Sequence, residues 1–295
     1  MTSRLSYIYA LLAILFWSTV PTAFKISLAE LSVLHMLAIA TFTSTFILFI
    51  ILITGRKGNL IFKSTGKEIV HSAILGLINP FLYYLILLKA YQLLPAQVAQ
   101  PLNMIWPILL VFLSIPLLGQ KIKGKSFIAL FISFFGVYII SSQGNLFGHG
   151  HSDIRGVLLA TGSAFFWAFY FILNVRDHRD ESVKLFLNFL FGSVYLIIAM
   201  AVTGDWLTAG HSFRGITAAV YTGIFEMGIT FFLWLKALRL ASSTDKISNL
   251  VYLAPFLSLI FIHFILHEPV YYTTPVGLLF IMTGIWFQNR KPATG

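Results

Sequence analysis

Long apolar segments occupy most of the chain, and short polar stretches separate them. Ten such segments can be marked, at 5–26, 31–54, 68–89, 95–118, 126–143, 154–175, 184–204, 214–236, 244–266 and 271–288. A membrane-spanning helix needs about 20 predominantly apolar residues, and continuous runs of this length favour membrane helices over helices of a soluble core. The sequence therefore predicts an all-α integral membrane protein with ten transmembrane helices.

The composition excludes other classes of protein. Of the 295 residues, 58% are hydrophobic and only 10% are charged, whereas a soluble domain has about 45–50% apolar and about 25% charged residues. A disordered chain would lack this apolar content. Ten spans would use about 200 residues, which leaves only short loops and tails, so we expect no soluble domain.

Basic residues are distributed unequally between the two sides of the predicted bundle. With the N-terminus placed inside, sixteen Lys and Arg residues fall on the inner side and four on the outer side. Cytoplasmic loops carry such an excess, so we expect both termini to be cytoplasmic. The net charge of +10 is then mostly a topology signal, and we expect no nucleic-acid partner. The outer residues are Lys25, Lys89, Arg155 and Arg214, and the inner ones are Arg4, Arg56, Lys57, Lys63, Lys67, Lys121, Lys123, Lys125, Arg176, Arg179, Lys184, Lys236, Arg239, Lys246, Arg290 and Lys291.

Short motifs recur along the chain at a nearly constant offset. Phe16-Trp17 recurs as Phe166-Trp167, Leu88-Lys89-Ala90 as Leu235-Lys236-Ala237, Pro107 as Pro255 and Gly136 as Gly284, at offsets of 150, 147, 148 and 148 residues. We therefore predict two five-helix repeats, 1–145 and 146–295. Because five is an odd number, the second repeat begins on the opposite side of the membrane and is inverted. Inverted repeats are typical of many secondary transporters.

These features together resemble the EamA family of the drug/metabolite transporter superfamily. The resemblance covers essentially the whole chain and is carried by the ten spans, the paired halves, the two Phe-Trp motifs, Pro107, Pro255 and the His267-Glu268 that ends the ninth span. The family often has Gly-Glu after the fourth span, where this chain has Gly119-Gln120. The resemblance implies a carrier in the cytoplasmic (inner) membrane, often an exporter of amino acids or other small metabolites.

An acidic side chain lies deep in one predicted span. Glu226 is near the middle of the segment 214–236, and no other Asp or Glu in the sequence lies so deep. A charged residue at the bilayer centre costs at least about 2.5–3.5 kcal/mol on insertion scales, so it is a candidate functional site. A carboxyl group that gains and loses a proton there could couple transport to a proton gradient. The alternative is a permanently protonated glutamate that joins helices by hydrogen bonding.

The repeat relates Glu226 to Asn79 and Thr230 to Tyr83, at an offset of 147 residues. Each pair is spaced i, i+4, so its members are expected to share one helix face. We therefore predict that the third and eighth spans contribute equivalent polar stripes to a central substrate site. Pro80 follows Asn79 and could free a backbone carbonyl to bind a ligand.

Two further spans contribute polar residues to this predicted site. Gln100 and Asn103 on the fourth span and Tyr252 on the ninth lie on faces that are too polar for lipid. They either line a pore or hold helices together, and the sequence favours neither. Pro107 and Pro255 are predicted hinges, because proline removes one backbone hydrogen bond, although a fixed kink is an equal alternative.

Aromatic residues also lie deep in the first and sixth spans. Trp17, Trp167 and Tyr170 are away from the membrane interface where Trp is usually enriched. They could form an aromatic cavity wall that suits planar or cationic solutes. Ordinary helix packing is the alternative, because 16% of the chain is aromatic.

The function predicted from these features is secondary active transport of a small metabolite by alternating access. An amino acid or a related neutral, zwitterionic or cationic solute suits an apolar cavity with one acidic group better than a polyanion does. The direction is expected to be export, which rests on the resemblance. The alternatives are a channel or a membrane partner protein and, least of all, an intramembrane enzyme, whose nucleophile-elbow and metalloprotease motifs are missing.

We expect the substrate and the lipid bilayer to be the partners, and the protein to be a monomer or a homodimer. The sequence has no phosphate-binding loop for ATP hydrolysis. No cofactor or metal is expected. His149, His151 and Asp153 could hold a metal weakly, but a solvated turn is the simpler interpretation of this loop.

Overall fold

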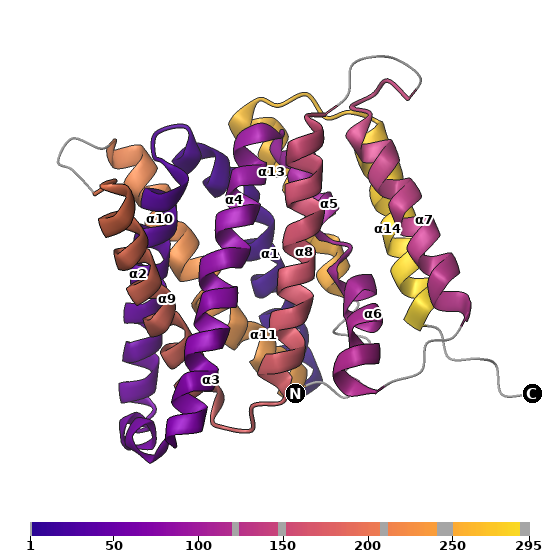
Figure 1. The fold of residues 1–295 in the computed structure, drawn as a ribbon. Coiled ribbons are helices and arrows are strands. Elements are labelled where there is room, and N and C mark those ends of the chain that lie inside the picture. Colours follow the sequence, from indigo (N-terminus) through magenta and orange to yellow (C-terminus); the bar gives the residue numbers. More distant parts are fainter. Residues whose placement is uncertain (1, 120–123, 147–151, 207–211, 241–249, 290–295) are drawn as a thin grey trace, which may run out of the picture.

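The computed structural model describes residues 2–119, 124–146, 152–206, 212–240 and 250–289, and these residues form helices and connections without a strand (Figure 1). His149 and His151 lie outside the described residues. In chain order the elements are α1 (Thr2–Leu28), α2 (Val33–Thr54), η1 (Gly58–Lys63), α3 (Gly66–Gly76), η2 (Leu77–Leu82), α4 (Tyr83–Leu93), α5 (Ala96–Asn103), α6 (Trp106–Leu118), α7 (Gly124–Ser141), α8 (Ile154–Val175), α9 (Glu181–Thr203), α10 (Phe213–Phe225), α11 (Ile229–Leu240), η3 (Val251–Leu253), α13 (Ala254–Leu266) and α14 (Thr273–Asn289).

Several of these helices are long and apolar enough to cross a membrane. Within the described residues there are six such candidates, Arg4–Leu28, Val33–Thr54, Gly66–Leu93, Ala96–Leu117, Ile154–Asn174 and Glu181–Thr203. Shorter apolar helices cover Ser126–Ser141, Ala254–Leu266 and Thr273–Phe287. The prediction of an all-helical, multi-pass membrane protein is confirmed at this level, and the count of ten spans stays a prediction.

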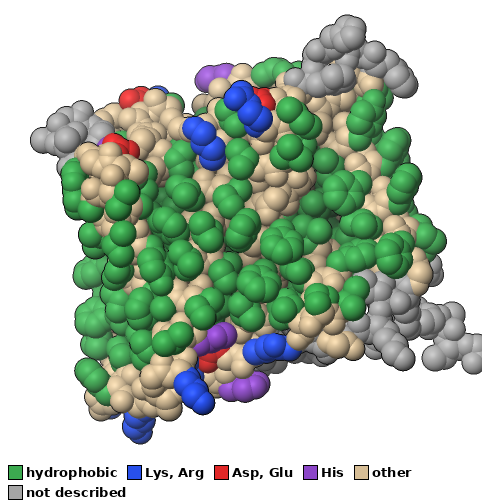
Figure 2. Space-filling model, viewed as in Figure 1, with side chains coloured by type: hydrophobic (Ala, Val, Ile, Leu, Met, Phe, Trp, Pro, Cys, Tyr) green, Lys and Arg blue, Asp and Glu red, His purple; other side chains and the backbone are tan. Residues whose placement is uncertain are grey.

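The outer surface of the bundle is apolar. Phe131 is 80% exposed, Val202 is 81% exposed and Phe46 is 63% exposed. Figure 2 shows hydrophobic side chains covering the middle of one face, with Lys, Arg, Asp, Glu and His side chains near its upper and lower rims. Apolar patches of this extent are rare on soluble monomers, and lipid chains are the surroundings that suit them.

Two of the prolines, Pro80 and Pro107, lie where helical segments are interrupted. Proline has no N–H and its ring clashes with the carbonyl four residues earlier. In this chain, α3 ends at Gly76, four residues before Pro80, and α5 ends at Asn103, four residues before Pro107. Between α3 and α4, Asn79 is non-helical at φ −145° and ψ 120°. The two pieces of each segment therefore meet at a break that the sequence itself imposes.

The segment that carries Glu226 is also interrupted, without a proline. Helix α10 ends at Phe225 and α11 begins at Ile229. A Cβ atom on Gly228 would lie 2.8 Å from the carbonyl oxygen of Ile224, so this turn requires glycine. After the break, the Thr230 hydroxyl donates to the Phe225 carbonyl, which satisfies an oxygen that the ended helix leaves free.

The helices pack in matching pairs drawn from the two halves of the chain. α2 packs against α9, α7 against α14, α1 against α10, α11 and α13, and α8 against α4, α5 and α6. In the α2–α9 pair, the hydroxyls of Thr45 and Ser193 are 2.9 Å apart. In the α7–α14 pair, a Cβ atom on Gly136 would lie 2.5 Å from the backbone oxygen of Gly277. Small residues therefore let these helices approach backbone to backbone.

Charged residues gather where α8 connects to α9. Arg179 forms an ion pair with Asp177 at 2.5 Å and donates to the Ser72 hydroxyl at 2.7 Å. Burial opposes ionisation of Asp177, but the hydrogen bonds from Arg179 outweigh it and hold the pKa of this carboxyl below its usual range. Lys57 pairs with Asp180 at 2.8 Å. These contacts tie the α8–α9 connection to α3 and to the start of η1.

Candidate functional site

Glu226 lies at the break between α10 and α11 and is joined to the other half of the chain. Its backbone N–H donates to the Thr222 carbonyl at 2.8 Å, which closes the last turn of α10. Its Oε1 accepts a hydrogen bond of 3.0 Å from the hydroxyl of Tyr84 on α4. Tyr84 is only 1% exposed. The carboxyl group is therefore held by a buried donor, at the place where α10 ends.

Aromatic rings surround this hydrogen bond. The rings of Tyr83 and Tyr84 are 4.6 Å apart, and those of Tyr83 and Trp167 are 5.0 Å apart. Trp167 in turn lies 5.8 Å from Tyr170 and 6.5 Å from Trp106. These tilted and edge-on contacts are the preferred geometry of aromatic pairs, so α4, α6 and α8 meet in one continuous aromatic layer.

A buried amide links this layer to α5. Asn103 accepts a hydrogen bond of 3.2 Å from the Tyr83 hydroxyl and donates one of 2.8 Å to the Ser163 hydroxyl. Asn103 is 8% exposed. Because buried polar groups are costly unless they are paired, this chain of contacts fixes α4, α5 and α8 together. We call the group formed by Tyr83, Tyr84, Asn103, Trp167, Tyr170 and Glu226 the Glu226 cluster.

Most of the other residues predicted for the site lie in separate contacts. Trp17 packs on Trp234 with the ring centroids 5.5 Å apart, and Gln100 accepts a hydrogen bond from Ser258 on α13. Asn79 is buried and its side chain is hydrogen-bonded to Tyr170 of the Glu226 cluster, while its Oδ1 has no hydrogen-bond partner among the described residues. Thr230 is hydrogen-bonded to the Phe225 carbonyl. The described contacts thus join neither Asn79 nor Thr230 to the Glu226 carboxyl.

Two features of the prediction change with these contacts. The i, i+4 stripes assumed unbroken helices, but the chain is interrupted both at Asn79 and between Phe225 and Ile229. Tyr84, which is not among the residues predicted from the sequence, provides the hydrogen bond to Glu226. Pro107 and Pro255 each lie in the first turn of a helix, α6 and α13. The side chain of Tyr252 lies outside the described part of the structure.

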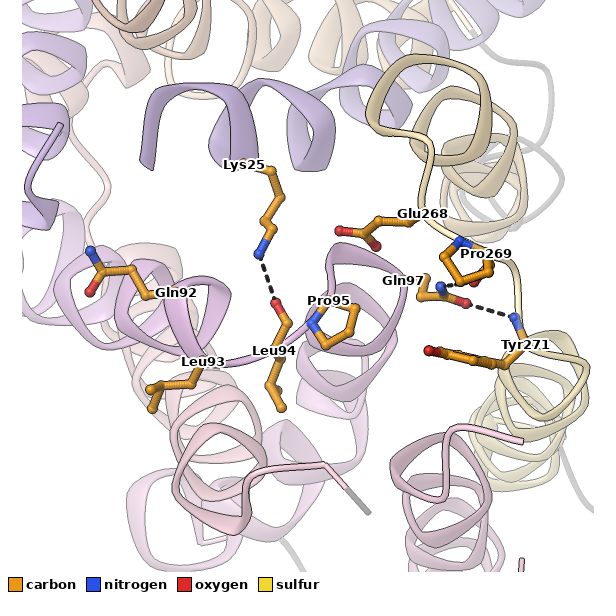
Figure 3. Close-up of a pocket in the computed structure, with 9 residues that line it drawn as sticks. All are labelled: Lys25, Gln92, Leu93, Leu94, Pro95, Gln97, Glu268, Pro269 and Tyr271. Carbon is orange, nitrogen blue, oxygen red and sulfur yellow. Dashed lines mark hydrogen bonds between the residues drawn. The ribbon is translucent and has the colours of Figure 1, made fainter. Parts of the chain in front are cut away.

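A pocket opens at one end of the bundle, beyond the end of α4. It has a volume of about 290 Å³, and Lys25 and Glu268 are among its lining residues (Figure 3). A second cavity of about 400 Å³ shares Lys25 and Gln92 with it. The charged residues of the pocket come from opposite ends of the sequence, because Lys25 is on α1 and Glu268 follows α13.

The model of one protein family matches the chain twice. The EamA-like transporter family matches residues 4–142 and again residues 154–290. The chain belongs to this family. A solved crystal structure that is 20% identical covers 100% of both chains with a TM-score of 0.66. At that identity the likeness shows the fold alone.

Curated relatives of this EamA-like protein are named as transporters. The uncharacterized transporter YvbV of Bacillus subtilis is 29% identical, over 83% of this chain and 79% of its own. An uncharacterized transporter of Clostridium kluyveri is 25% identical, over 97% of this chain and 94% of its own. One from Archaeoglobus fulgidus is 26% identical, over 95% and 96%. The family resemblance drawn from the sequence is therefore confirmed, and the names indicate transporters rather than enzymes.

Proposed function

We propose that this EamA-like protein is a secondary active transporter that moves a small metabolite across the cytoplasmic membrane by alternating access. The observation that carries the proposal is the hydrogen bond between Glu226 and Tyr84, 3.0 Å long, which joins an acidic side chain at a helix break to a buried aromatic cluster. Interrupted helices that meet at a polar site are how many transporters build their substrate sites.

The inverted repeat is part of this proposal. It is supported by the two matches of the family model, 4–142 and 154–290. It is also supported by the packing of helices of the first half against helices of the second half, as in the α2–α9 and α7–α14 pairs. Gly119 and His267, which lie 148 residues apart in the sequence, each end a helix with positive φ, at 65° and 57°. Two copies of one plan in opposite orientations give two arrangements of similar energy, one open to each side of the membrane.

The substrate is proposed to bind at the Glu226 cluster. Aromatic rings and one carboxyl group suit a small neutral, zwitterionic or cationic solute, and they disfavour a polyanion. Glu226 is the proposed proton-coupling residue. Trp17, Asn79, Gln100, Thr230 and Tyr252 stay proposed substrate residues that reach the solute in another state of the transport cycle.

Movement between the two states is proposed to occur at the helix breaks. Pro107 and Pro255 are the proposed hinges, and each stands in the first turn of a helix, α6 or α13, where proline costs no intrahelical hydrogen bond. The basic residues favour an orientation with both termini in the cytoplasm, and export is the proposed direction. A monomer or a homodimer would serve this mechanism.

A thermal-shift screen followed by a counterflow assay tests this function. We expect an amino acid, polyamine, nucleoside or cationic drug to raise the melting temperature of the purified protein, because a ligand that binds the folded state stabilises it. In proteoliposomes, preloading with the unlabelled solute should then accelerate uptake of the labelled solute. Uptake that preloading leaves unchanged would indicate a channel instead, since a pore has no obligatory exchange.

A further inference from the structure

The pocket at the end of the bundle contains one cationic and one anionic side chain. The Nζ atom of Lys25 donates to the carbonyls of Tyr91 at 2.9 Å and Leu94 at 3.1 Å, at the end of α4. An ammonium group has three N–H donors. Within the described residues two of them are used, so one remains for an acceptor in the pocket.

The carboxyl group of Glu268 has one oxygen in use and one free. Its Oε1 accepts a hydrogen bond of 3.2 Å from the backbone N–H of Ala96, at the start of α5. Its Oε2 is buried and has no hydrogen-bond partner among the described residues. Because an unpaired buried carboxylate oxygen is costly, this atom is suited to a donor that the protein itself does not supply.

The two charges face one space without pairing with each other. Figure 3 shows the Lys25 side chain reaching toward the Leu94 carbonyl while the Glu268 carboxyl group turns toward the same space. Among the described residues, Lys25 and Glu268 do not form an ion pair with each other. A gap of about 290 Å³ bounded by one cation and one anion matches a solute that carries both charges.

The two glutamines that line the pocket already make hydrogen bonds. The side-chain nitrogen of Gln97 donates to the Pro269 carbonyl, and its oxygen accepts from Tyr271 and Thr274. The Oε1 atom of Gln92 accepts a hydrogen bond of 2.9 Å from Lys89. Among the described residues that line this pocket, Lys25 and Glu268 are the charged ones. A dicarboxylate would meet Glu268 unfavourably, and a polyamine would meet Lys25 unfavourably, because like charges repel. The volume is below that of most drug-sized sites, which favours a small solute.

We propose that the Lys25–Glu268 pocket binds a small zwitterion, with the carboxylate of the solute at Lys25 and its ammonium group at Glu268. This proposal adds a binding site to the proposed transporter. It rests on the proposed function in that the bound zwitterion is taken to be the transported solute. Helix α4 connects the two places, since Tyr91 is seven residues beyond Tyr84. Phe24 packs edge-on against both tyrosines, 6.5 Å from Tyr84 and 5.1 Å from Tyr91, and so lies between the pocket and the Glu226 cluster.

Equilibrium binding to the purified full-length protein in detergent tests this site. The probes are the neutral α-amino acids up to the size of leucine, and the N-acetyl and amide derivatives of the tightest binder, each of which lacks one charge. We expect the zwitterion to bind and each single-charge derivative to bind about tenfold or more weakly, as for lost hydrogen bonds to charged groups. Equal affinity for the amino acid, its N-acetyl derivative and its amide overturns the proposal. So does the absence of binding by any neutral amino acid.

Variants then locate the bound molecule. Lys25→Met and Glu268→Gln should each weaken zwitterion binding about tenfold or more. Lys67→Met, at an exposed lysine on α3 that is not in the lining of the pocket, should leave it unchanged. Binding that is lost in Glu226→Gln and retained in Lys25→Met overturns the pocket site while transport at the Glu226 cluster stands. Zwitterion binding that depends on Lys25, without any transport in proteoliposomes, supports the pocket and contradicts the proposed function.

Discussion

Glu226→Gln is expected to abolish accumulation of solute against its gradient while solute exchange continues. Glutamine keeps an oxygen that can accept the hydrogen bond from Tyr84, which is 3.0 Å long in the native protein, but it cannot bind or release a proton. With one proton exchanged for each solute, a gradient of one pH unit supplies about 1.4 kcal/mol and supports about tenfold accumulation. The proton-driven accumulation ratio in proteoliposomes should therefore fall about tenfold for each pH unit imposed.

One control variant and one further variant help to separate loss of coupling from loss of structure. Glu30→Gln removes an acidic group from an exposed position at the end of α1, and it should leave accumulation unchanged. Tyr84→Phe removes the donor to Glu226 and should weaken coupling without removing the titratable group. If the Glu226→Gln protein accumulates solute as well as the native protein does, the assignment of proton coupling to this residue is wrong.

Gly136→Ala is expected to destabilise the protein, and Gly136→Val more strongly. The first added carbon would lie 2.5 Å from the backbone oxygen of Gly277 and 2.9 Å from the side chain of Ile281. Backbone atoms cannot rotate away, so α7 and α14 would have to separate. Overpacking of this kind costs about 1–3 kcal/mol, and part of the α7–α14 interface would be lost with it. The melting temperature in detergent measures the effect.

Gly162→Ala is the matched control for this substitution. Gly162 lies within α8, and an added Cβ atom there would meet no atom within 4 Å. Alanine favours a helix over glycine by about 0.5–1 kcal/mol, so the control should leave the melting temperature unchanged or raise it slightly. A Gly136→Ala protein as stable as the Gly162→Ala protein would show that α7 and α14 do not pack this closely.

The helical, membrane-spanning character of the chain could be predicted from the sequence because it depends on local properties. Apolar length and proline position act within a few residues, and the helices that precede Pro80 and Pro107 end four residues before each proline. The break after Phe225 was harder to foresee. It depends on Gly228 and on the crowding of backbone oxygens around it, and glycine alone is too common in membrane helices to indicate a break.

Some residues predicted for the site contact one another, and their role in binding stays a prediction. Tyr83, Asn103 and Trp167 were chosen as polar or aromatic residues deep in their spans, and they meet in one cluster. Tyr84 was missed because, in an unbroken helix, the residue five positions after Asn79 lies on a different face from Asn79. The π-helical turn η2, with Asn79 non-helical inside it, changes the phase of both tyrosines relative to the residues before the break. The pocket that Lys25 and Glu268 line together could not be predicted either, since 243 residues separate them in the sequence.

The central claim is that movement of solute is coupled to movement of protons through Glu226, and internal pH in proteoliposomes measures this most directly. A pH-sensitive dye is enclosed, no pH gradient is imposed, and the solute found in the thermal-shift screen is added outside. With the native protein, we expect solute entry to drive protons out and to make the interior more alkaline, whereas Glu226→Gln should take up solute with no change of pH. Solute entry without a pH change in the native protein, or an equal change in Glu226→Gln, would contradict it.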